Sequence, residues 1–297
     1  MIFINYYDEI KNELVNNEIT KKVKDYSKNR SDLTTYYNVG KLLSEAGKHY
    51  GEGIIKEYSK RLTNELGKGY SISNLKRMRQ FYIVIEKGAT MSHQLSWSHY
   101  CELLPVNSID KINYYIKITK EQNLSIRELR AKIKNNEYER LDESTKEKLK
   151  EKEKLKLPDL VKNPIQIKNT SGNNEISEKV LQKLILEDIP SFLDELGNGF
   201  TFVRNEYKIK IGDRYNYIDL LLFNYEFNCF VVVELKVSEL KKEHIGQIEF
   251  YMNYIDKNLK KINQNKTIGI IICKKENRYV IEYCSDDRIL AREYELI

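Results

Sequence analysis

The stretch Phe-Val-Val-Val-Glu-Leu-Lys-Val at residues 230–237 decides the fold of the second half of this chain. A run of Val and Leu this dense predicts a strand that is buried on both faces, as the central strands of α/β sheets are. Side chains alternate across a strand, so Glu234 and Lys236 point to the same side. Because an unpaired buried charge is costly, these two charges need a reason. They indicate either a Glu–Lys pair at a sheet edge or a site that needs a carboxylate beside an ammonium group.

The residues around this strand predict an α/β domain. The expected elements, in chain order, are a helix at 176–196, strands at 200–211 and 215–223 joined by a Gly212-Asp213 hairpin turn, the strand at 229–237, a helix at 243–259, and strands at 267–273 and 279–283. Glycines after residue 196 are helix stop signals, and the Gly-Asp pair is a hairpin signal. This order predicts a mixed central sheet with helices on its faces.

The first part of the chain has the periodicity of helices, with apolar residues three and four apart. Helices are expected at about 36–43, 54–66, 74–85, 98–103, 109–121 and 125–135. Ser125 followed by Glu128 fits a capping box at the start of the last of these helices. Residues 141–158 then carry dense mixed charge, and prolines and a polar run follow. We therefore expect an all-helical N-terminal domain at 1–140, a charged linker at 141–174 and an α/β domain at 175–297.

Composition bounds the function only loosely. The 297 residues carry a formal net charge of +6, which is compatible with a nucleic-acid partner but does not establish one. No apolar run has the length of a membrane span and the first residues lack a secretory signal, so we expect a cytoplasmic protein with no membrane partner. The four cysteines have no zinc-binding spacing, and Cys229 and Cys273 are expected to be reduced core thiols.

A second acid lies in the strand expected before residues 230–237. Asp219 is the one charged residue in Tyr-Ile-Asp-Leu-Leu-Leu-Phe at 217–223. If the two strands are neighbours, Asp219 and Glu234 converge, and their mutual repulsion is relieved by a cation. Carboxylate oxygens suit Mg²⁺ or Mn²⁺, which can activate a water, and Lys236 could position that water or offset phosphate charge. The alternative for Asp219 is a turn contact at the end of its strand.

An acid on one strand followed by Glu-Leu-Lys on the next resembles the motif of PD-(D/E)xK nucleases. Gln247 and Tyr251, four residues apart on the next expected helix, resemble the Gln-x-x-x-Tyr extension found in part of that superfamily. They share one helix face, so both could point at the site. The simpler alternatives are a solvated Gln and a core Tyr.

The resemblance extends over most of the chain to the bacterial YhcG-like family. The similar segments are 62–71, 74–82, 95–100, 192–200, 217–221 and Gly246-Gln247. Proteins of this family join a helical N-terminal domain to a restriction-endonuclease-like PD-(D/E)xK domain. The resemblance implies a metal-dependent nuclease in which Asp219 and Glu234 hold Mg²⁺, Lys236 attends the attacking water, and Gln247 and Tyr251 support the site.

One position departs from the superfamily pattern. Its nucleases often add a Glu from the first helix of the domain, where this chain has Gln182. Glu178 lies one turn earlier on the same helix face, so it is the candidate that could substitute as a metal ligand.

The N-terminal domain contains a helix, a glycine-bearing turn and a second helix at 54–82, a pattern that resembles a helix–turn–helix. We expect Ser73 to cap the second helix, with Leu75, Met78 and Tyr82 facing inward. The residues left to contact nucleic acid are Lys68, Lys76, Arg77, Arg79 and Gln80. The alternative is a solvated helix face. Trp97, His99 and Tyr100 are expected to be packing residues.

Three functional hypotheses follow from these features. The first is a Mg²⁺-dependent DNA endonuclease whose helical domain recruits DNA. The second is a catalytically weak DNA-binding or assembly protein on a nuclease-like scaffold, which Gln182 would suit. The third is a helical domain that binds a protein, including a second copy of the chain, so that its basic helix is incidental. The sequence does not distinguish DNA from RNA, or duplex from branched or single-stranded substrates.

Overall fold

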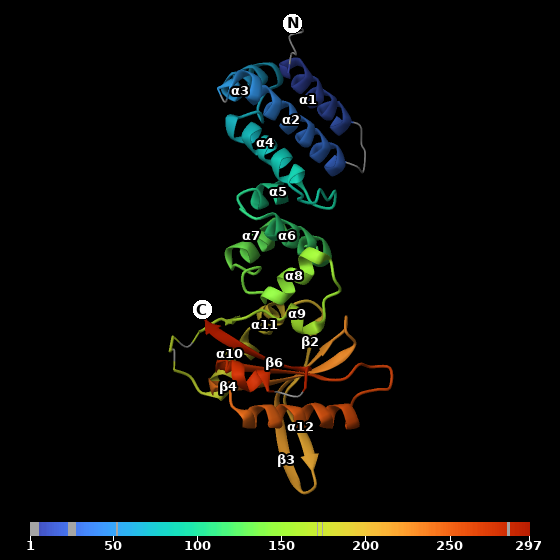
Figure 1. Cartoon of the computed structure of the whole chain (residues 1–297), viewed down its shortest axis with the longest axis vertical. Helices are drawn as coiled ribbons and strands as arrows, with labels where there is room; N and C mark the ends of the chain where they lie inside the picture. Colours follow the sequence, from blue (N-terminus) through green and yellow to red (C-terminus); the bar gives the residue numbers. More distant parts are fainter. Residues whose placement is uncertain (1–5, 23–27, 52, 171, 174, 284–285) are drawn as a thin grey trace. The chain divides into compact units, whose positions relative to one another are not determined.

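The protein divides into two compact units, Met1–Tyr138 and Glu139–Ile297, in a computed structural model (Figure 1). The structure describes residues 6–22, 28–51, 53–170, 172–173, 175–283 and 286–297. The first unit is helical and the second contains a sheet, as the sequence predicts, but this sheet has six strands where five were expected.

The helical unit contains α1 (Tyr6–Lys22), α2 (Lys28–Tyr50), α3 (Ile54–Leu66), α4 (Ile72–Glu86), α5 (Trp97–Leu103), α6 (Ile109–Gln122) and α7 (Ile126–Lys134). Apolar side chains of α1, α2, α3 and α4 form one core, whose members include Leu43, Leu62 and Leu75. A Cβ atom on Gly40 would lie 2.2 Å from the carbonyl oxygen of Met78. Helices α2 and α4 therefore cross with their backbones in close approach, which only glycine permits at this position.

Helix caps in this unit differ in part from the sequence prediction. Helix α4 begins after Ser71, whose side chain accepts a hydrogen bond from the Asn74 N–H, so the prediction of Ser73 as the cap was wrong. Ser71 has the extended backbone that a cap requires, whereas Ser73 is already helical. The capping box of Ser125 and Glu128 is confirmed.

The second unit is built on a sheet of strand order β1-β6-β5-β4-β3-β2. The strands are β1 (Ile165–Ile167), β2 (Phe200–Ile211), β3 (Arg214–Asn224), β4 (Cys229–Glu239), β5 (Ile268–Lys275) and β6 (Ile289–Leu296). β2, β3 and β4 pair antiparallel, whereas β4, β5, β6 and β1 pair parallel. The sheet is therefore mixed, as expected from the order of the elements.

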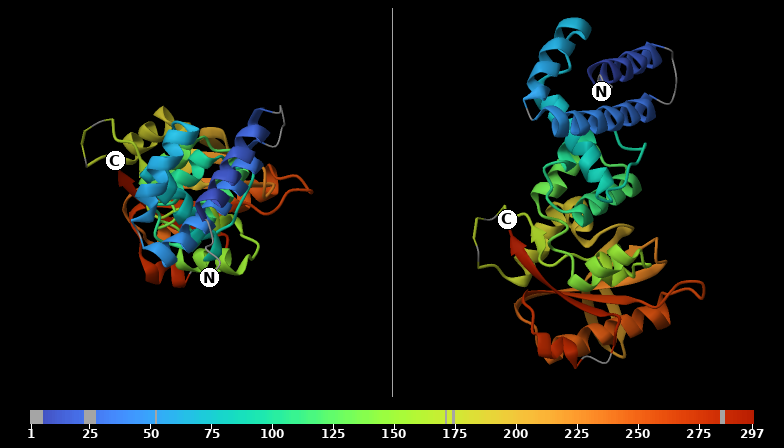
Figure 2. Two further views of the ribbon diagram at one scale, coloured as in Figure 1. Left: turned by 90° about the horizontal axis from the view of Figure 1, so that it is seen from above. Right: turned by 45° about the horizontal axis from the view of Figure 1, so that its top comes forward.

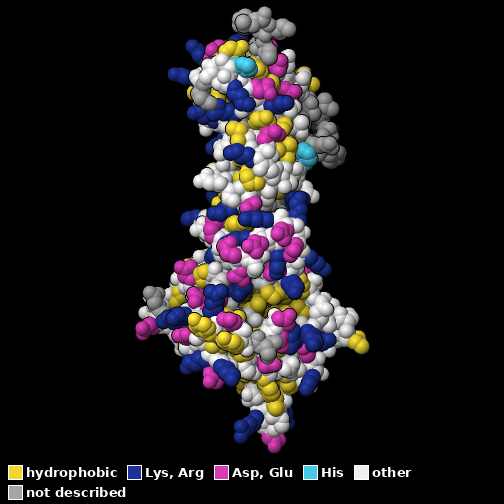
Figure 3. Space-filling model, viewed as in Figure 1, with side chains coloured by type: hydrophobic (Ala, Val, Ile, Leu, Met, Phe, Trp, Pro, Cys, Tyr) yellow, Lys and Arg dark blue, Asp and Glu magenta, His cyan; other side chains and the backbone are white. Residues whose placement is uncertain are grey.

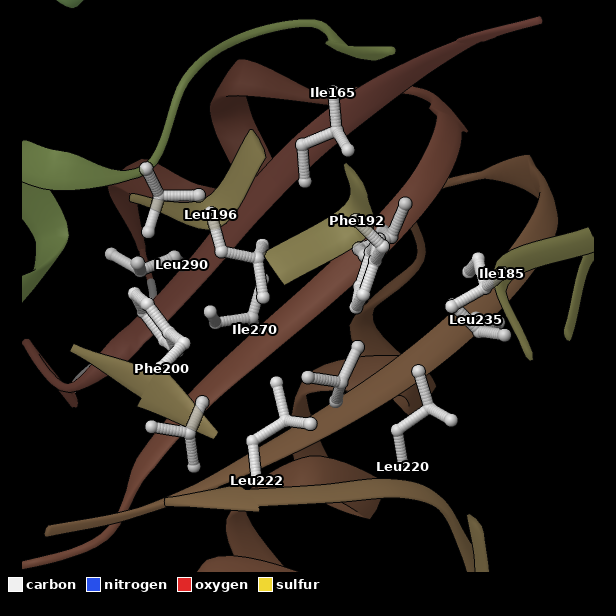
Figure 4. Packing of buried hydrophobic residues seen from close by; sticks show 14 of the residues in the cluster. Ile165, Ile185, Phe192, Leu196, Phe200, Leu220, Leu222, Leu235, Ile270 and Leu290 are labelled. Carbon is white, nitrogen blue, oxygen red and sulfur yellow. The ribbon is translucent and has the colours of Figure 1, made fainter. Parts of the chain in front are cut away.

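Helices cover both faces of this sheet (Figures 1 and 2). One face packs against α10 (Glu178–Glu187) and α11 (Ile189–Leu196), and Figure 4 shows Leu220, Leu222 and Leu235 of the sheet in this layer. The other face packs against α12 (Lys242–Asn258). Because β4 is covered on both sides, Val231, Val232 and Val233 are fully buried.

Two predicted elements of this unit need correction. The single helix expected at 176–196 is divided at Asp188, whose side chain accepts a hydrogen bond from the Ser191 N–H and so caps α11. The strand expected at 279–283 is a short helix, α13 (Arg278–Glu282), because Asn277 caps it through the Val280 N–H. The last strand is β6.

The expected linker at 141–174 belongs instead to the second unit. It contains α8 (Glu143–Glu151), α9 (Leu157–Leu160) and β1, which pairs with β6. Leu157, Val161 and Ile165 enter the core cluster on the face of the sheet that packs against α10 and α11. These three residues are buried although charged residues surround them in the sequence. The guanidinium of Arg292 on β6 fixes this segment by donating to the Val161 carbonyl at 3.1 Å and to the Asp142 carboxylate at 2.8 Å.

Two expectations from composition can be compared with the described part of the chain. There, no helix has both the length and the apolar character needed to cross a membrane. Cys229 and Cys273 are buried free thiols, as expected, and Cys101 is a half-buried free thiol. Cys284 lies outside the described residues.

Candidate active site

Asp219 and Glu234 converge at the point where β3 and β4 separate. The backbone ladder between these strands ends at Leu220 and Val233, and the two acids come directly after that pair. The Asp219 carboxylate accepts a hydrogen bond from the Leu235 N–H at 2.8 Å, while the Asp219 N–H lies 3.5 Å from Glu234 Oε1. Side chains therefore replace backbone partners here, and this holds the two carboxylates beside one another.

Lys236 supplies a positive charge to this pair of acids. Its Nζ lies 3.4 Å from Glu234 Oε2 and 3.9 Å from Glu178 Oε2 on α10. Glu234 is 2% exposed and Lys236 is 8% exposed, whereas the Glu178 side chain is about half exposed. The ammonium group of Lys236 therefore lies between a buried acid of β4, Glu234, and a solvent-accessible acid of α10, Glu178.

Burial and mutual repulsion change the proton affinity of both strand acids. Burial raises the pKa of Asp219, and burial together with the charge of Asp219 raises the pKa of Glu234 to about 8. The positive charge of Lys236 acts in the opposite direction at both groups. Such a pair retains a proton near neutral pH unless a cation replaces that proton.

The donor atoms at this point suit a hard divalent cation. Asp219 and Glu234 offer carboxylate oxygens, which are the ligands that Mg²⁺ and Mn²⁺ prefer. Among the described residues, no three His, Cys, Asp or Glu side chains already form a metal cluster. A cation held by these two acids would therefore keep several water ligands, as Mg²⁺ usually does.

Helix α10 contributes differently at its two predicted positions, Glu178 and Gln182. Gln182 is buried and donates its side-chain N–H to the backbone carbonyl of Asp219 at 3.0 Å. It therefore anchors α10 to β3 and holds the backbone of an acid. Glu178 lies at the start of α10, where its carboxylate contacts Lys236. The structure brings Glu178 to the site and gives Gln182 a supporting contact.

Helix α12 brings Gln247 and Tyr251 to the same region. The Gln247 side-chain N–H donates to the Tyr251 hydroxyl at 3.2 Å, as their shared helix face predicts. Burial raises the pKa of Tyr251, and the charges of Glu234 and Asp219 raise it further. The phenol is therefore close enough to the two acids to sense their charge.

The chain is similar to known proteins in both of its units. Residues 158–297 match the model of the YhcG PDDEXK nuclease domain. The second unit is a YhcG-type nuclease domain. Residues 9–140 match the DUF1016 N-terminal domain. The presumed nuclease YhcG of Escherichia coli (strain K12) is 27% identical over 95% of this chain and 88% of its own length.

Solved structures resemble less than half of this chain, and only distantly. A repair endonuclease from Pyrococcus abyssi is 19% identical over 43% of this chain and 50% of its own, with a TM-score of 0.30. An EndoMS–dsDNA2 complex is 18% identical over 43% of this chain and 49% of that chain, with a TM-score of 0.32. The chain spans about half the length of these proteins.

Two further residues of the YhcG-type nuclease domain interact electrostatically with residues of the candidate site, and sequence reasoning missed both. The pKa of His244 on α12 is lowered by burial, then by the charges of Lys236 and Lys241. The spacing of three residues between His244 and Gln247 is the signal that could have revealed it. Glu206 on β2 raises the pKa of Asp219 through its charge.

The backbone of Glu206 is unusual for a strand residue. Its φ of +44° lies in the left-handed region, which non-glycine residues adopt at a cost of roughly 1–2 kcal/mol. Its neighbours Asn205 and Tyr207 pair with Leu220 and Ile218, so Glu206 lies level with Asp219 across the hairpin. Backbone strain of this kind is common at functional sites, but no sequence pattern predicts it at Glu206.

The residues predicted to contact nucleic acid lie on α4 and in the turn before it. Lys68, Lys76, Arg77 and Gln80 are exposed, and Arg79 is half-buried. The Gln80 side chain donates to the Leu104 carbonyl at 2.6 Å, which gives it a structural contact in the helical unit.

The aromatic group after α4 packs within the helical unit. Trp97 contacts Phe81 and Tyr36, and Tyr100 is buried. His99 closes a capping box with Ser96. These contacts agree with the prediction that the group is structural.

Proposed function

We propose that this nuclease hydrolyses phosphodiester bonds in DNA with Mg²⁺ as its metal ion, and that Mn²⁺ can substitute. The observation that supports the proposal is the buried meeting point of Asp219, Glu234 and Lys236. A divalent cation at the two carboxylates would supply an activated water and would polarise the phosphate. These residues would be the family's nuclease motif in this chain.

The protein's own side chains would divide the remaining work. Lys236 would hold the attacking water and offset charge on the phosphate. Glu178 would extend the acidic donor set from the first helix, since it already contacts Lys236. Gln247 and Tyr251 would orient substrate or water through their linked amide and hydroxyl groups.

DNA is the proposed substrate because basic side chains are available away from the acids. The net charge is +6, and the residues that would contact phosphates in the helical unit are Lys68, Lys76, Arg77 and Arg79, with Gln80 beside them. Replacing Lys76, Arg77 and Arg79 together should flatten the salt dependence of DNA binding. An unchanged slope would favour a helical unit that binds a protein partner or a second copy of the chain.

Asp219→Asn tests the metal site most directly. The variant should lose Mg²⁺ binding in titration calorimetry and Mg²⁺-dependent cleavage of plasmid and oligonucleotide DNA, while its circular dichroism and melting curve stay near those of wild type. Asp287→Asn is the matched control, since Asp287 is an exposed acid of the same unit. Metal binding and cleavage that survive Asp219→Asn would exclude this site.

Gln182 supports a second candidate, a DNA-binding or assembly protein with little turnover. Its side chain occupies the first-helix position with a neutral amide bound to the Asp219 carbonyl. On this alternative, DNA binding persists in EDTA, and neither Mg²⁺ nor Mn²⁺ binds or promotes cleavage. Calorimetric metal binding by wild type, lost in Asp219→Asn, would reject it.

A further inference from the structure

The β2–β3 hairpin continues beyond the active site as a two-stranded ribbon (Figure 1). The strands remain paired as far as Ile211 and Arg214, and Gly212 in the turn has a φ of +57°. This conformation suits the tight turns that join hairpin strands. The ribbon therefore projects as an ordered element.

The two faces of this ribbon differ in chemistry. Ile209 and Ile218 are fully buried and pack with α12 in the second core cluster. The opposite side carries Lys208, Lys210, Tyr215 and Tyr217, which we call the Lys–Tyr face. Tyr215 and Tyr217 are 52% and 51% exposed. In Figure 3 basic and hydrophobic side chains share the surface of the projecting hairpin.

Cross-strand contacts organise the Lys–Tyr face. Lys208 is opposite Tyr217, and Lys210 is opposite Tyr215. The Nζ atoms of Lys208 and Lys210 lie 3.8 Å and 6.0 Å from the centre of the Tyr215 ring. This cation–π contact holds the ammonium groups beside the aromatic ring instead of leaving both side chains free in solvent.

The Lys–Tyr face begins at the active site. Tyr217 precedes Asp219 by two residues on β3, a distance of roughly 7 Å along a strand. Lys208 follows Glu206 by two residues on β2. A polymer whose scissile phosphate reaches Asp219 therefore has its neighbouring units within reach of the Lys–Tyr face.

We propose that the Lys–Tyr face binds a nucleic-acid strand whose bases are unpaired next to the scissile phosphate. Lysines match phosphates in charge, and tyrosine rings stack on bases, whose flat faces a duplex conceals. The inference rests on the proposed nuclease function and specifies its substrate: a single strand, or a single-stranded region beside the cleaved bond. The pairing of basic with aromatic side chains across the two strands favours this polymer over a protein partner.

Tyrosine variants test the stacking. Binding of the full-length protein to a fluorescein-labelled oligothymidylate is measured by anisotropy in EDTA, with a duplex of equal length beside it. Tyr215→Ala combined with Tyr217→Ala should weaken single-strand binding by about 10-fold or more, whereas the double Phe variant should bind like wild type. Equal binding by the Ala and Phe variants, or equal losses for duplex and single strand, would overturn the inference.

Lysine variants test the phosphate contacts. Lys208→Ala combined with Lys210→Ala should reduce the slope of log K against log salt by about 1.4 for a single strand. The control pair, Lys257→Ala with Lys266→Ala, removes two exposed lysines outside the Lys–Tyr face, one in the last turn of α12 and one in the segment before β5, and should leave the slope unchanged. A slope that falls equally in both pairs would contradict a localised surface.

The outcome is separable from that of the nuclease proposal. Cleavage with Mg²⁺ or Mn²⁺ is scored on wild type alone, whereas binding is scored in EDTA on all variants. Variant-sensitive single-strand binding without any wild-type cleavage would support the Lys–Tyr face and reject the nuclease. If the wild type cleaves DNA but both double Ala variants bind the single strand as tightly as wild type, the nuclease proposal is supported and the Lys–Tyr face is rejected.

Discussion

The Asp219 carboxylate accepts a hydrogen bond from the backbone N–H of Leu235 at 2.8 Å. This bond joins β3 to β4 just past the last backbone pair, so it fixes the acid at the point where the strands part. The same contact places Asp219 beside Glu234, the residue before Leu235. A side chain that completes the ladder therefore also builds the proposed metal site.

Lys236→Ala should remove cleavage while leaving the fold intact. Loss of one positioned charge at a developing anion typically costs roughly 10²–10³-fold in rate. The removed ammonium group contacts Glu234 and Glu178 but is not itself a metal ligand. Metal binding, measured by calorimetry, should therefore persist. Lys242→Ala, an exposed lysine at the start of α12, is the control. Equal cleavage rates for wild type and Lys236→Ala would remove Lys236 from the mechanism.

The metal-free protein should lose stability as pH rises. Glu234 has a folded-state pKa of about 8, above its ordinary value of 4.5, because it is buried beside Asp219. Its favourable contribution is complete below about pH 4.5 and disappears as pH passes through about 8. Melting temperatures in EDTA should therefore fall across this window in wild type, and less in Glu234→Gln. Parallel pH profiles for the two proteins would contradict the raised pKa.

Substitutions of Gln182 and Glu178 on α10 should affect different properties, stability for Gln182 and metal binding for Glu178. Gln182→Ala removes the donor to the Asp219 carbonyl and should lower the free energy of unfolding by about 1 kcal/mol. Glu178→Gln removes an exposed carboxylate and should instead weaken Mg²⁺ binding by roughly 10-fold. Urea unfolding and calorimetry on both variants check this. Mg²⁺ affinity that is unchanged in Glu178→Gln would exclude Glu178 from the metal site.

Arg292→Met should loosen the segment between the two predicted domains. It leaves the Val161 carbonyl and the Asp142 carboxylate without this donor, at a cost of roughly 1–3 kcal/mol in unfolding free energy. Hydrogen exchange should accelerate first in α9 and β1. Arg278→Met, an exposed arginine, should change neither. Unchanged exchange at residues 157–167 would show that Arg292 does not hold them.

Gly40→Ala should destabilise the helical unit. Its new Cβ would lie 2.2 Å from the Met78 carbonyl oxygen, so α2 and α4 would have to move apart. Overpacking of this kind costs roughly 1–3 kcal/mol, measurable by urea unfolding. Gly53→Ala is the control, because a Cβ there meets nothing within 4 Å. Equal stability of the two variants would contradict the close crossing.

Much of the second unit could be predicted because its signals are local. Apolar strand runs, the Gly212-Asp213 turn and the embedded charges Asp219, Glu234 and Lys236 are each readable within a few residues. The linker prediction failed because Leu157, Val161 and Ile165 are spread among charged neighbours. Their burial depends on β6, which is distant in sequence.

The sequence by itself determined the alternation of strands and helices and the identity of the charged residues inside the strands, because hydrophobic periodicity acts locally. Only the tertiary structure decided that Gln182 binds the Asp219 carbonyl, that Glu206 has a left-handed backbone, and that His244 lies near Lys236. These relationships join elements far apart in the chain. They depend on strand register and on helix packing, which no local pattern encodes.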